Sequence, residues 1–428
     1  MQLIEEVAEK DPRLGDLCVS YMLSLSPATK KEDVDALLDK AIAFCVGRRD
    51  SLLLTACYLH NSQQIPASRD ASLALLLKTY LAVLSAARKT PSQSVILAGG
   101  EIAANATHDM LTKDLFPALS RAVKRNAEMA IPCILRAATS LKVDPSRYLS
   151  FLVDTCMHLF KQESETARFT SLLSTTIQRC SDGEAILNFV LSLLKEMDQG
   201  RFTPAVRRVV YVGVHVILAN VRERVMGKTA VAALGKSMSA QLLKTVQKET
   251  NATAKVACCD CLGAAVSMSG EVSEDVMKWI EANTAATAFK QGVLFVLMQA
   301  TSTPCQSFNA ELLMPKLGEV ITAAIARPFI AGCDGVMALP SLVQLSILAG
   351  KEVPAAVSQA LQEGSVLLQN SVLFGNKEDE IVARWTHQSI LRLAVLAMNG
   401  HALKEEEQMR VMQLVFVLMV GAAWRAEA

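Results

Sequence analysis

Three cysteines crowd into the stretch KVACCDCLGAA at residues 255–265, and two of them, Cys258 and Cys261, form a Cys-x-x-Cys pair. This spacing occurs in zinc sites and in redox dithiols. A structural zinc site needs four ligands, yet the other cysteines stand singly and so do the histidines. The sequence therefore predicts no metal site and no cofactor.

A redox dithiol of the thioredoxin type lies where a strand meets the start of a helix. Here the pair falls two turns inside a helix predicted over 251–268, in which Val256, Cys259, Gly263 and Val266 share one stripe. Cysteine packs like a small apolar residue. The cluster is therefore predicted to be a buried, reduced helix face.

A second stretch, RERVMGKTA, ends like a phosphate-binding loop at Gly227, Lys228 and Thr229. Arg222 stands where that motif needs its first glycine, and no strand precedes it. We interpret it as a turn between two helices. Esterase, zinc-protease and paired-carboxylate patterns are not found in the sequence either, so we expect no enzyme and no small-molecule substrate.

Basic side chains gather near predicted helix ends. The candidate contacts to phosphates are Lys124, Arg125, Arg207, Arg208, Arg222 and Arg224. In stacked helix pairs the turns align along one edge, where a row of cations can meet phosphates. The alternative is that these residues are solvated turns, or cations that favour the carboxyl ends of helices.

The amino-acid composition predicts that the elements carrying these residues are helices. Of 428 residues, 51% are apolar and only 5% aromatic, and no long β-type alternation occurs. Lysine and arginine number 43 against 42 acidic residues, so no bulk charge favours DNA or a membrane. The apolar run at 411–424 is shorter than the roughly 20 residues that span a bilayer. The first residues show no signal peptide, and the cysteines then favour a cytoplasmic protein with reduced thiols.

Apolar residues recur with helical spacing in one segment after another. Helices are predicted at 114–125 with Asp114 as N-cap, then at 128–141, 144–160, 164–180, 181–197, 203–221, 229–247, 251–268, 273–283, 285–301, 313–321, 336–350, 353–368, 378–398 and 405–424. Candidate second helices of pairs recur at a spacing of about 35–47 residues, as in HEAT and armadillo arrays.

The fold class is therefore predicted as all-α, a HEAT/armadillo-type solenoid of stacked antiparallel helix pairs. We expect one continuous array over 1–428, possibly a fragment of a longer one. Within it, 1–90 holds N-terminal helices, 110–301 the best-defined repeats and 310–428 the C-terminal repeats.

One stretch goes beyond architecture. Its elements are a Leu-x-Pro motif at 115–117 that opens a predicted helix, an Asp-x-Ser-x-Tyr turn at Asp144, Ser146 and Tyr148, a Cys-Ser-Asp joint at 180–182, and the run KWIEANTAATAFKQG. Over roughly 114–300 these resemble the N-terminal region of the general-control-non-derepressible HEAT-repeat scaffold. That family is the ribosome-associated activator of the amino-acid-starvation initiation-factor kinase.

The resemblance implies a non-catalytic cytoplasmic scaffold that binds ribosomes, through ribosomal RNA or ribosomal proteins, together with other translation-control proteins. It carries kinase activation to no residue of this chain, because the kinase-binding region is not recognisable here. An importin-type transport receptor and a microtubule-binding TOG-type array stay open as alternative scaffolds.

Overall fold

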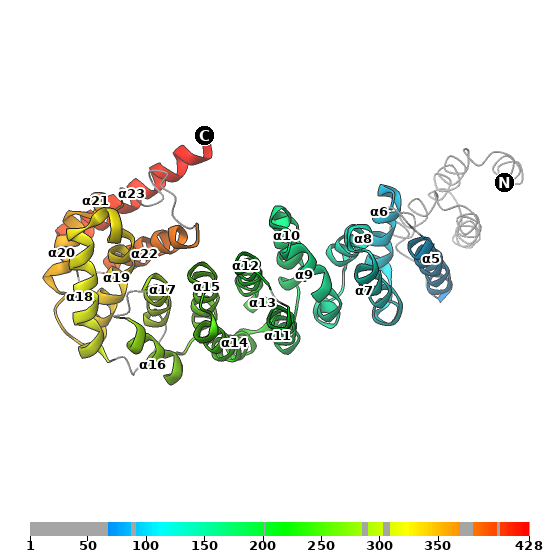
Figure 1. Ribbon diagram of the computed structural model, residues 1–428, viewed down its shortest axis with the longest axis horizontal. Helices are drawn as coiled ribbons and strands as arrows, with labels where there is room; N and C mark the ends of the chain where they lie inside the picture. The colour runs from blue at the N-terminus through cyan, green and yellow to red at the C-terminus, as the bar shows by residue number, and fades with distance from the viewer. Residues whose placement is uncertain are drawn as a thin grey trace, which may run out of the picture. The chain divides into compact units, whose positions relative to one another are not determined.

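A computed structural model describes residues 67–86, 91–200, 202–284, 290–302, 309–368, 380–399 and 403–427. Every regular element within these ranges is a helix (Figure 1). Consecutive helices are joined by short turns and pack as neighbours, so the fold is an all-α solenoid, as predicted. The chain divides into two compact units, the first made of 1–200 with 220–226 and the second of 201–219 with 227–428.

The first unit begins, among the described residues, with α5. Its helices are α5 (Ala67–Ala86), α6 (Gln93–Asn105), the π-helix η4 (Met110–Leu115), α7 (Phe116–Arg125), α8 (Ala127–Ser140), the 3₁₀ helix η5 (Pro145–Leu152), α9 (Val153–Phe160), the 3₁₀ turn η6 (Glu163–Glu165), α10 (Thr166–Ile177), α11 (Gly183–Gln199) and the short α13 (Glu223–Met226). Its core includes a stack of Phe116 on Tyr148, with ring centroids 5.0 Å apart. An edge-to-face contact joins Phe160 to Phe169.

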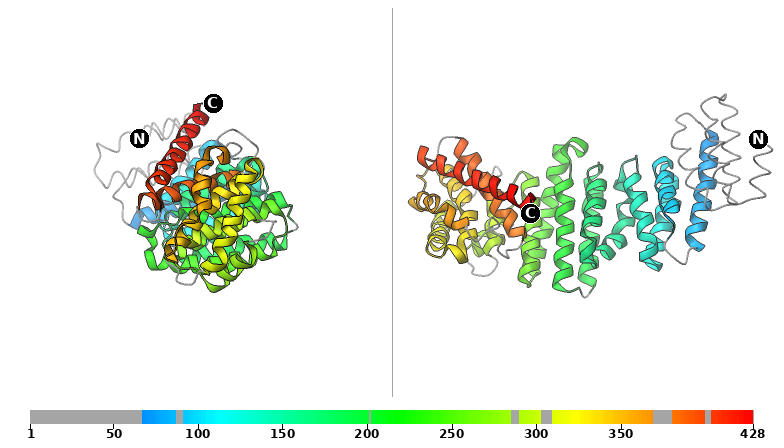
Figure 2. Two further views of the ribbon diagram at one scale, coloured as in Figure 1. Left: turned by 90° about the vertical axis from the view of Figure 1, so that its left-hand side faces the viewer. Right: turned by 90° about the horizontal axis from the view of Figure 1, so that it is seen from above.

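The second unit holds the longer helices. They are α12 (Pro204–Asn220), α14 (Lys228–Lys248), α15 (Ala252–Ser269), α16 (Glu274–Asn283), α17 (Lys290–Thr301), α18 (Ala310–Ala326), α19 (Pro328–Leu348), α20 (Ala355–Gln362), α21 (Gly364–Leu368), α22 (Glu380–Met398) and α23 (Glu405–Glu427). Helix α14 packs on α15 and α18 packs on α19 as hairpins, and α17 packs against both α15 and α19. Figure 2 shows the successive helices of the array from two further directions.

Polar side chains cap the starts of three helices. The side chains of Asn126, Asp182 and Asn251 accept hydrogen bonds from backbone N–H groups in the first turns of α8, α11 and α15. An N-cap of this kind satisfies donors that have no partner inside the helix. The helices predicted from 128, 181 and 251 therefore start within two residues of the predicted positions.

Three local predictions are wrong. Asp114 caps no helix, because the π-helix η4 runs through it and continues directly into α7. The segment 144–160 is not one α-helix: it starts as the 3₁₀ helix η5 and becomes α-helical only at Val153. The segment 353–368 is interrupted at Glu363, where α20 ends before α21 begins.

Helix α19 is long and apolar enough to cross a membrane by length and composition. However, 72% of its apolar window is buried inside the protein. A core helix of a helical protein has the same character.

The prediction of one array over 1–428 stays a prediction, and residues 1–66 lie outside the described residues.

Candidate functional site

Four of the six candidate cations are exposed and belong to the first unit. Lys124 and Arg125 form the last turn of α7, and Lys124 Nζ lies 3.3 Å from Asp154 Oδ2. Surface ion pairs of this kind contribute little to stability, so the lysine remains available to another anion. Arg222 directly precedes α13 and Arg224 lies within it, and both side chains are exposed to solvent.

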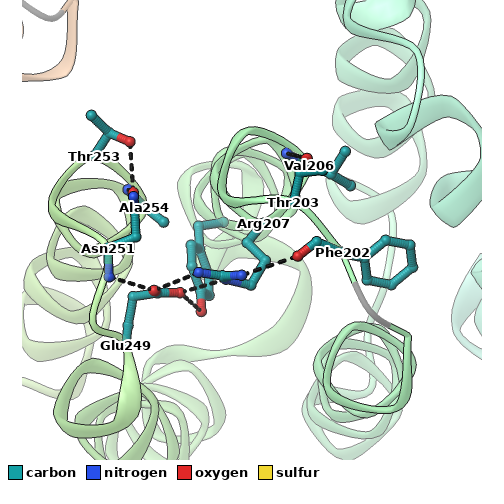
Figure 3. A network of polar contacts seen from close by, with 9 residues as sticks. Phe202, Thr203, Val206, Arg207, Glu249, Asn251, Thr253 and Ala254 are labelled. Carbon is teal, nitrogen blue, oxygen red and sulfur yellow. Dashed lines mark hydrogen bonds and ion pairs between the residues drawn. The ribbon is translucent and has the colours of Figure 1, made fainter.

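The other two cations lie on α12, in the second unit, and are half-buried. Figure 3 shows the Arg207 guanidinium against the carboxylate of Glu249, with Nε and Nη2 each donating to one oxygen at 2.9 Å. Its remaining nitrogen, Nη1, donates to the carbonyl of Phe202 at 3.0 Å. Arg208 donates to the carbonyl of Thr253 at 3.3 Å. Both side chains therefore hold α12 to the joint that connects α14 with α15.

Glu249 is the centre of this arrangement and is only 6% exposed. Besides Arg207, it accepts the N–H of Asn251 at 2.9 Å and the hydroxyl of Tyr211 at 3.2 Å. Burial alone would raise the pKa of the Glu249 carboxyl, but the hydrogen bonds from Arg207 and Asn251 outweigh it and lower that pKa. The charged carboxylate is thus a structural component of the joint.

The six residues consequently differ in kind, although their role as RNA contacts stays a prediction for all of them. Lys124, Arg125, Arg222 and Arg224 present charge to solvent. Arg207 binds the internal carboxylate of Glu249 with two parallel hydrogen bonds. Bidentate binding of a phosphate would need the same two donors. The partner of Arg207 lies 42 residues away in sequence, so the local pattern around 207 carries no sign of it.

Two of the short motifs that carry the family resemblance, the Asp-x-Ser-x-Tyr turn and the Cys-Ser-Asp joint, contact each other. Asp144 caps η5 by accepting the N–H of Ser146 at 2.9 Å, and it also accepts the N–H and the hydroxyl of Ser181. Ser146 Oγ in turn accepts the N–H groups of Ser181 and Asp182, each at 3.2 Å. The turn before η5 and the turn before α11 are thereby locked together, and we call this set of four residues the turn clasp.

Hydrogen bonding within the turn clasp changes the titration of its carboxylate. Burial raises the pKa of Asp144, but the hydrogen bonds from Ser146 and Ser181 more than offset this and leave the pKa below its usual value. Arg179 adds a further tie from the second turn, because it donates to the carbonyl of Val143 at 3.0 Å. Together these contacts hold the turn before η5 against the turn before α11.

His108, which lies just before the π-helix η4, also contacts η5. Arg147 Nη1 lies 2.7 Å from His108 Nε2, and Tyr148 Oη lies 2.7 Å from His108 Nδ1. A guanidinium has donors only, so Nε2 is the acceptor and the ring proton is on Nδ1, which faces Tyr148. In the Asp-x-Ser-x-Tyr motif, Tyr148 thus contacts His108 before η4, whereas Asp144 and Ser146 contact the turn before α11.

The cysteine cluster lies on a helix that is buried on nearly every side. Cys258, Cys259 and Cys261 are each 0% exposed in the middle of α15. Burial raises the pKa of the Cys259 thiol to about 12 and raises the pKa values of its two neighbours as well. Cys261 Sγ donates to the carbonyl of Tyr211 at 3.0 Å. The predicted buried helix face is confirmed, and in the described part of the chain no group of three or more His, Cys, Asp or Glu is placed to hold a metal.

Sequence reasoning missed the carboxylate in the middle of that cluster. Asp260 is 2% exposed and accepts Trp385 Nε1 at 2.7 Å, while Arg384 Nη2 also donates to it. His215 Nδ1 lies 3.0 Å from the second carboxylate oxygen. These partners come from α12 and α22, so Asp260 ties three helices together. The only local signal is an acid inside an otherwise uncharged run of small residues.

The aromatic side of this tie is equally close. The ring of Trp385 stacks on Phe295 of α17 with centroids 4.5 Å apart and an interplanar angle of 8°. A Cβ added at Gly292 would lie 2.7 Å from Cys259 Sγ, so that glycine permits α17 to approach α15 closely. The network is buried and internal, which is typical of a structural site that fixes helix packing.

These features define a helical-repeat protein whose charged groups are divided between internal ties and an exposed set of cations. Residues 74–202 match the family model described as "Stalled ribosome sensor GCN1 N-terminal". The family resemblance predicted from the sequence is thereby confirmed over that segment, which contains the whole turn clasp. No curated protein matches the chain.

Two solved structures are similar only in a general way. One is the crystal structure of an engineered protein, with 14% identity and a TM-score of 0.33, covering 92% of this chain and 98% of the other. The second is a homology model of the full-length AP-3 complex in an intermediate open conformation, with 11% identity and a TM-score of 0.26, covering 97% of this chain and 86% of the other. Similarity at this level supports no functional argument.

Proposed function

We propose that this chain is a non-catalytic helical scaffold that binds ribosomes, including stalled ones, in the cytoplasm. The observation that carries the proposal is the match of residues 74–202 to a family model whose description names a stalled-ribosome sensor. Within the matched segment, the turn clasp holds the turn before η5 and the turn before α11 together. A rigid edge of this kind suits a surface that must dock on a large particle, because little ordering entropy is lost on binding.

The exposed cations of the first unit supply part of the contact in this proposal. Lys124 and Arg125 lie inside the matched segment, in the last turn of α7. Arg222 and Arg224 belong to the same unit. Ribosomal RNA presents phosphates, and each phosphate contact releases counterions, so binding should weaken steeply as salt rises. Because the net charge of the chain is only +1, this salt dependence must come from local groups.

Arg207 and Arg208 contribute differently in this proposal. Their contacts with Glu249 and Thr253 place them in the framework of the second unit. Their part in ribosome binding would be to hold the joint in shape. The wider role in the amino-acid-starvation response, with other translation-control proteins as partners, rests on the family resemblance, and no residue described here is assigned to kinase activation.

Sedimentation tests the proposal. Purified chain is mixed with vacant ribosomes or with collided ribosomes and pelleted through a sucrose cushion, and microtubules are pelleted with the chain in parallel. We expect the chain to pellet with ribosomes, more strongly with collided ones, and to remain in the supernatant with microtubules. Pelleting with microtubules alone would favour the TOG-type alternative and contradict the proposed function.

A further inference from the structure

The continuous helix formed by η4 and α7 carries cations beyond the two at its end. Lys113 lies in η4 and Arg121 in α7, and both are exposed, as is Arg125 in the last turn. Within the described residues, the side chains of Arg121 and Arg125 form no ion pair and no hydrogen bond. We call Lys113, Arg121 and Arg125 the α7 row.

The buried side of the same helix fixes where the α7 row points. Leu111, Leu119 and Val123 are 0%, 0% and 4% exposed, and each cation of the row follows one of them by two positions. Two positions turn the chain by about 200° around the helix axis, so a residue two positions after a buried one faces the opposite side. The three cations therefore lie along one line on the solvent side of the helix.

The π-helix η4 brings the members of the α7 row into line. Residues eight positions apart, such as Lys113 and Arg121, are about 80° apart around a regular α-helix. In η4 the N–H of Phe116 donates to the carbonyl of Leu111, five residues earlier instead of four. The wider turn absorbs one residue, so the angle between Lys113 and Arg121 falls to about 20°. Wide turns of this kind inside helices occur frequently at functional sites.

The length of the α7 row suits a chain of phosphates. From Lys113 to Arg125 the row is roughly 17 Å long, because a helix rises about 1.5 Å per residue. One strand of a nucleic-acid duplex advances only about 3.4 Å per phosphate, so several successive phosphates can lie along the row.

The acidic residues near the α7 row leave its charge available. Lys113 Nζ lies 2.8 Å from Asp109 Oδ2, but the two side chains are 71% and 73% exposed, so this pair contributes little and a phosphate can replace the carboxylate. Asp114 is one position after Lys113, which turns it about 100° away from the row. The solvent-facing line itself is therefore positively charged along its length.

We propose that the α7 row binds the phosphate backbone of ribosomal RNA, with the strand running along the axis of η4 and α7. Lys113 and Arg121 are thereby two further contact residues beside Lys124 and Arg125. This assignment rests on the proposed ribosome binding, and the matched segment 74–202 contains the whole row. Cations that contact phosphates position a protein without reading bases, so binding at the row is independent of RNA sequence.

A charge-neutral exchange tests the geometry of the α7 row. The double variant Lys113→Asp/Asp114→Lys moves one cation by a single position, off the row, and leaves the net charge unchanged, whereas Arg121→Gln removes the middle cation. Co-sedimentation with ribosomes over a series of salt concentrations should show an affinity about three- to tenfold lower for either variant and a shallower salt dependence. Circular dichroism and thermal unfolding should match the wild type, because all the changed side chains are exposed.

The matched control is Lys195→Gln on α11, which removes an exposed cation of the same matched segment outside the α7 row and should bind like the wild type. The measurements are repeated with purified ribosomal RNA free of ribosomal proteins, to which both row variants should also bind more weakly.

The possible failures are distinguishable. A wild type that pellets with ribosomes while both row variants bind equally well would overturn the α7 row and leave the proposed function intact. Weaker binding of the variants to ribosomes with unchanged binding to purified RNA would assign the row to an acidic protein and overturn the phosphate assignment. A wild type that does not pellet with ribosomes would contradict the proposed function and the row with it.

Discussion

Arg207 and Glu249 join the first turn of α12 to the joint after α14 through two parallel hydrogen bonds, both 2.9 Å long. Arg207 was predicted from the sequence as an RNA contact, but in the structure it holds two parts of the second unit together. Reversing its charge would therefore disturb the fold as well as any surface. Tests of ribosome contact need the exposed cations of the first unit.

Replacing Arg207 with Ala should destabilise the second unit by about 1–3 kcal/mol, because Glu249 would remain buried with fewer donors. Urea unfolding followed by circular dichroism measures this change. The control Lys244→Ala, on the exposed face of α14, should stay within about 0.5 kcal/mol of the wild type. A double Arg207→Ala/Glu249→Ala variant that costs the full sum of the two single changes would show that the two residues do not act as a pair.

Asp144→Ala should destabilise the first unit by about 1–3 kcal/mol, because it removes the cap of η5 and the acceptor for Ser181 together. Hydrogen exchange should show faster exchange at the amides of Ser146 and Ser181. Asp198→Ala, which changes an exposed acid near the end of α11, is the matched control and should leave these amides protected. Equal exchange in both variants would contradict a structural role for the turn clasp.

The α15 cysteines should resist alkylation in the native protein. The pKa of Cys259 is raised to about 12, and burial removes access as well, so almost no thiolate is available near pH 8. Mass spectrometry after treatment with N-ethylmaleimide should find Cys258, Cys259 and Cys261 unmodified until denaturant is added. Stoichiometric zinc in the purified protein, or rapid native labelling at these positions, would contradict the buried helix face.

Stability should depend on pH through Glu249. Its carboxyl has a lower pKa in the folded chain than the ordinary value of 4.5: burial raises the pKa, but the hydrogen bonds from Arg207, Asn251 and Tyr211 and the charge of Arg207 together outweigh burial. A lowered folded pKa means that the stabilisation is present above the unfolded pKa and is lost as pH falls through the folded value. The stability difference between wild type and Glu249→Gln should thus be constant from pH 7 to about 5 and shrink below about pH 4.5. The exposed Glu196→Gln variant should show no such trend, and a difference that grows on acidification would contradict the assignment.

Much of the helix arrangement was predictable because helical periodicity and caps are local. The helix predicted at 251–268 is α15 (Ala252–Ser269), and Asn251 caps it. The π-helix before α7 was missed because its hydrogen-bond shift leaves no distinct residue pattern. The break at Glu363 was missed because the apolar spacing continues across it.

The contacts of the buried carboxylates Glu249 and Asp260 could not be predicted from the sequence, for another reason. Glu249 and Asp260 find their partners 42 and 124 residues away, and only the packing of helix pairs brings them together. The two turn motifs were recognised separately, through the family resemblance, but their joining at Asp144 and Ser181 required the structure. A charged residue inside a run of small apolar residues, as at Asp260, is a signal that could have been used.

Charge reversal at the end of α7 tests the central claim, ribosome binding through the exposed cations, most directly. Ribosome affinity is measured by co-sedimentation over a series of salt concentrations for the wild type, for Lys124→Glu/Arg125→Glu, and for the control Lys244→Glu/Lys248→Glu, which makes the same charge change on exposed residues of α14. We predict that the α7 variant loses about tenfold or more in affinity and shows a shallower salt dependence, while the control behaves like the wild type. An α7 variant that binds as tightly as the wild type, with the same salt dependence, would contradict the claim.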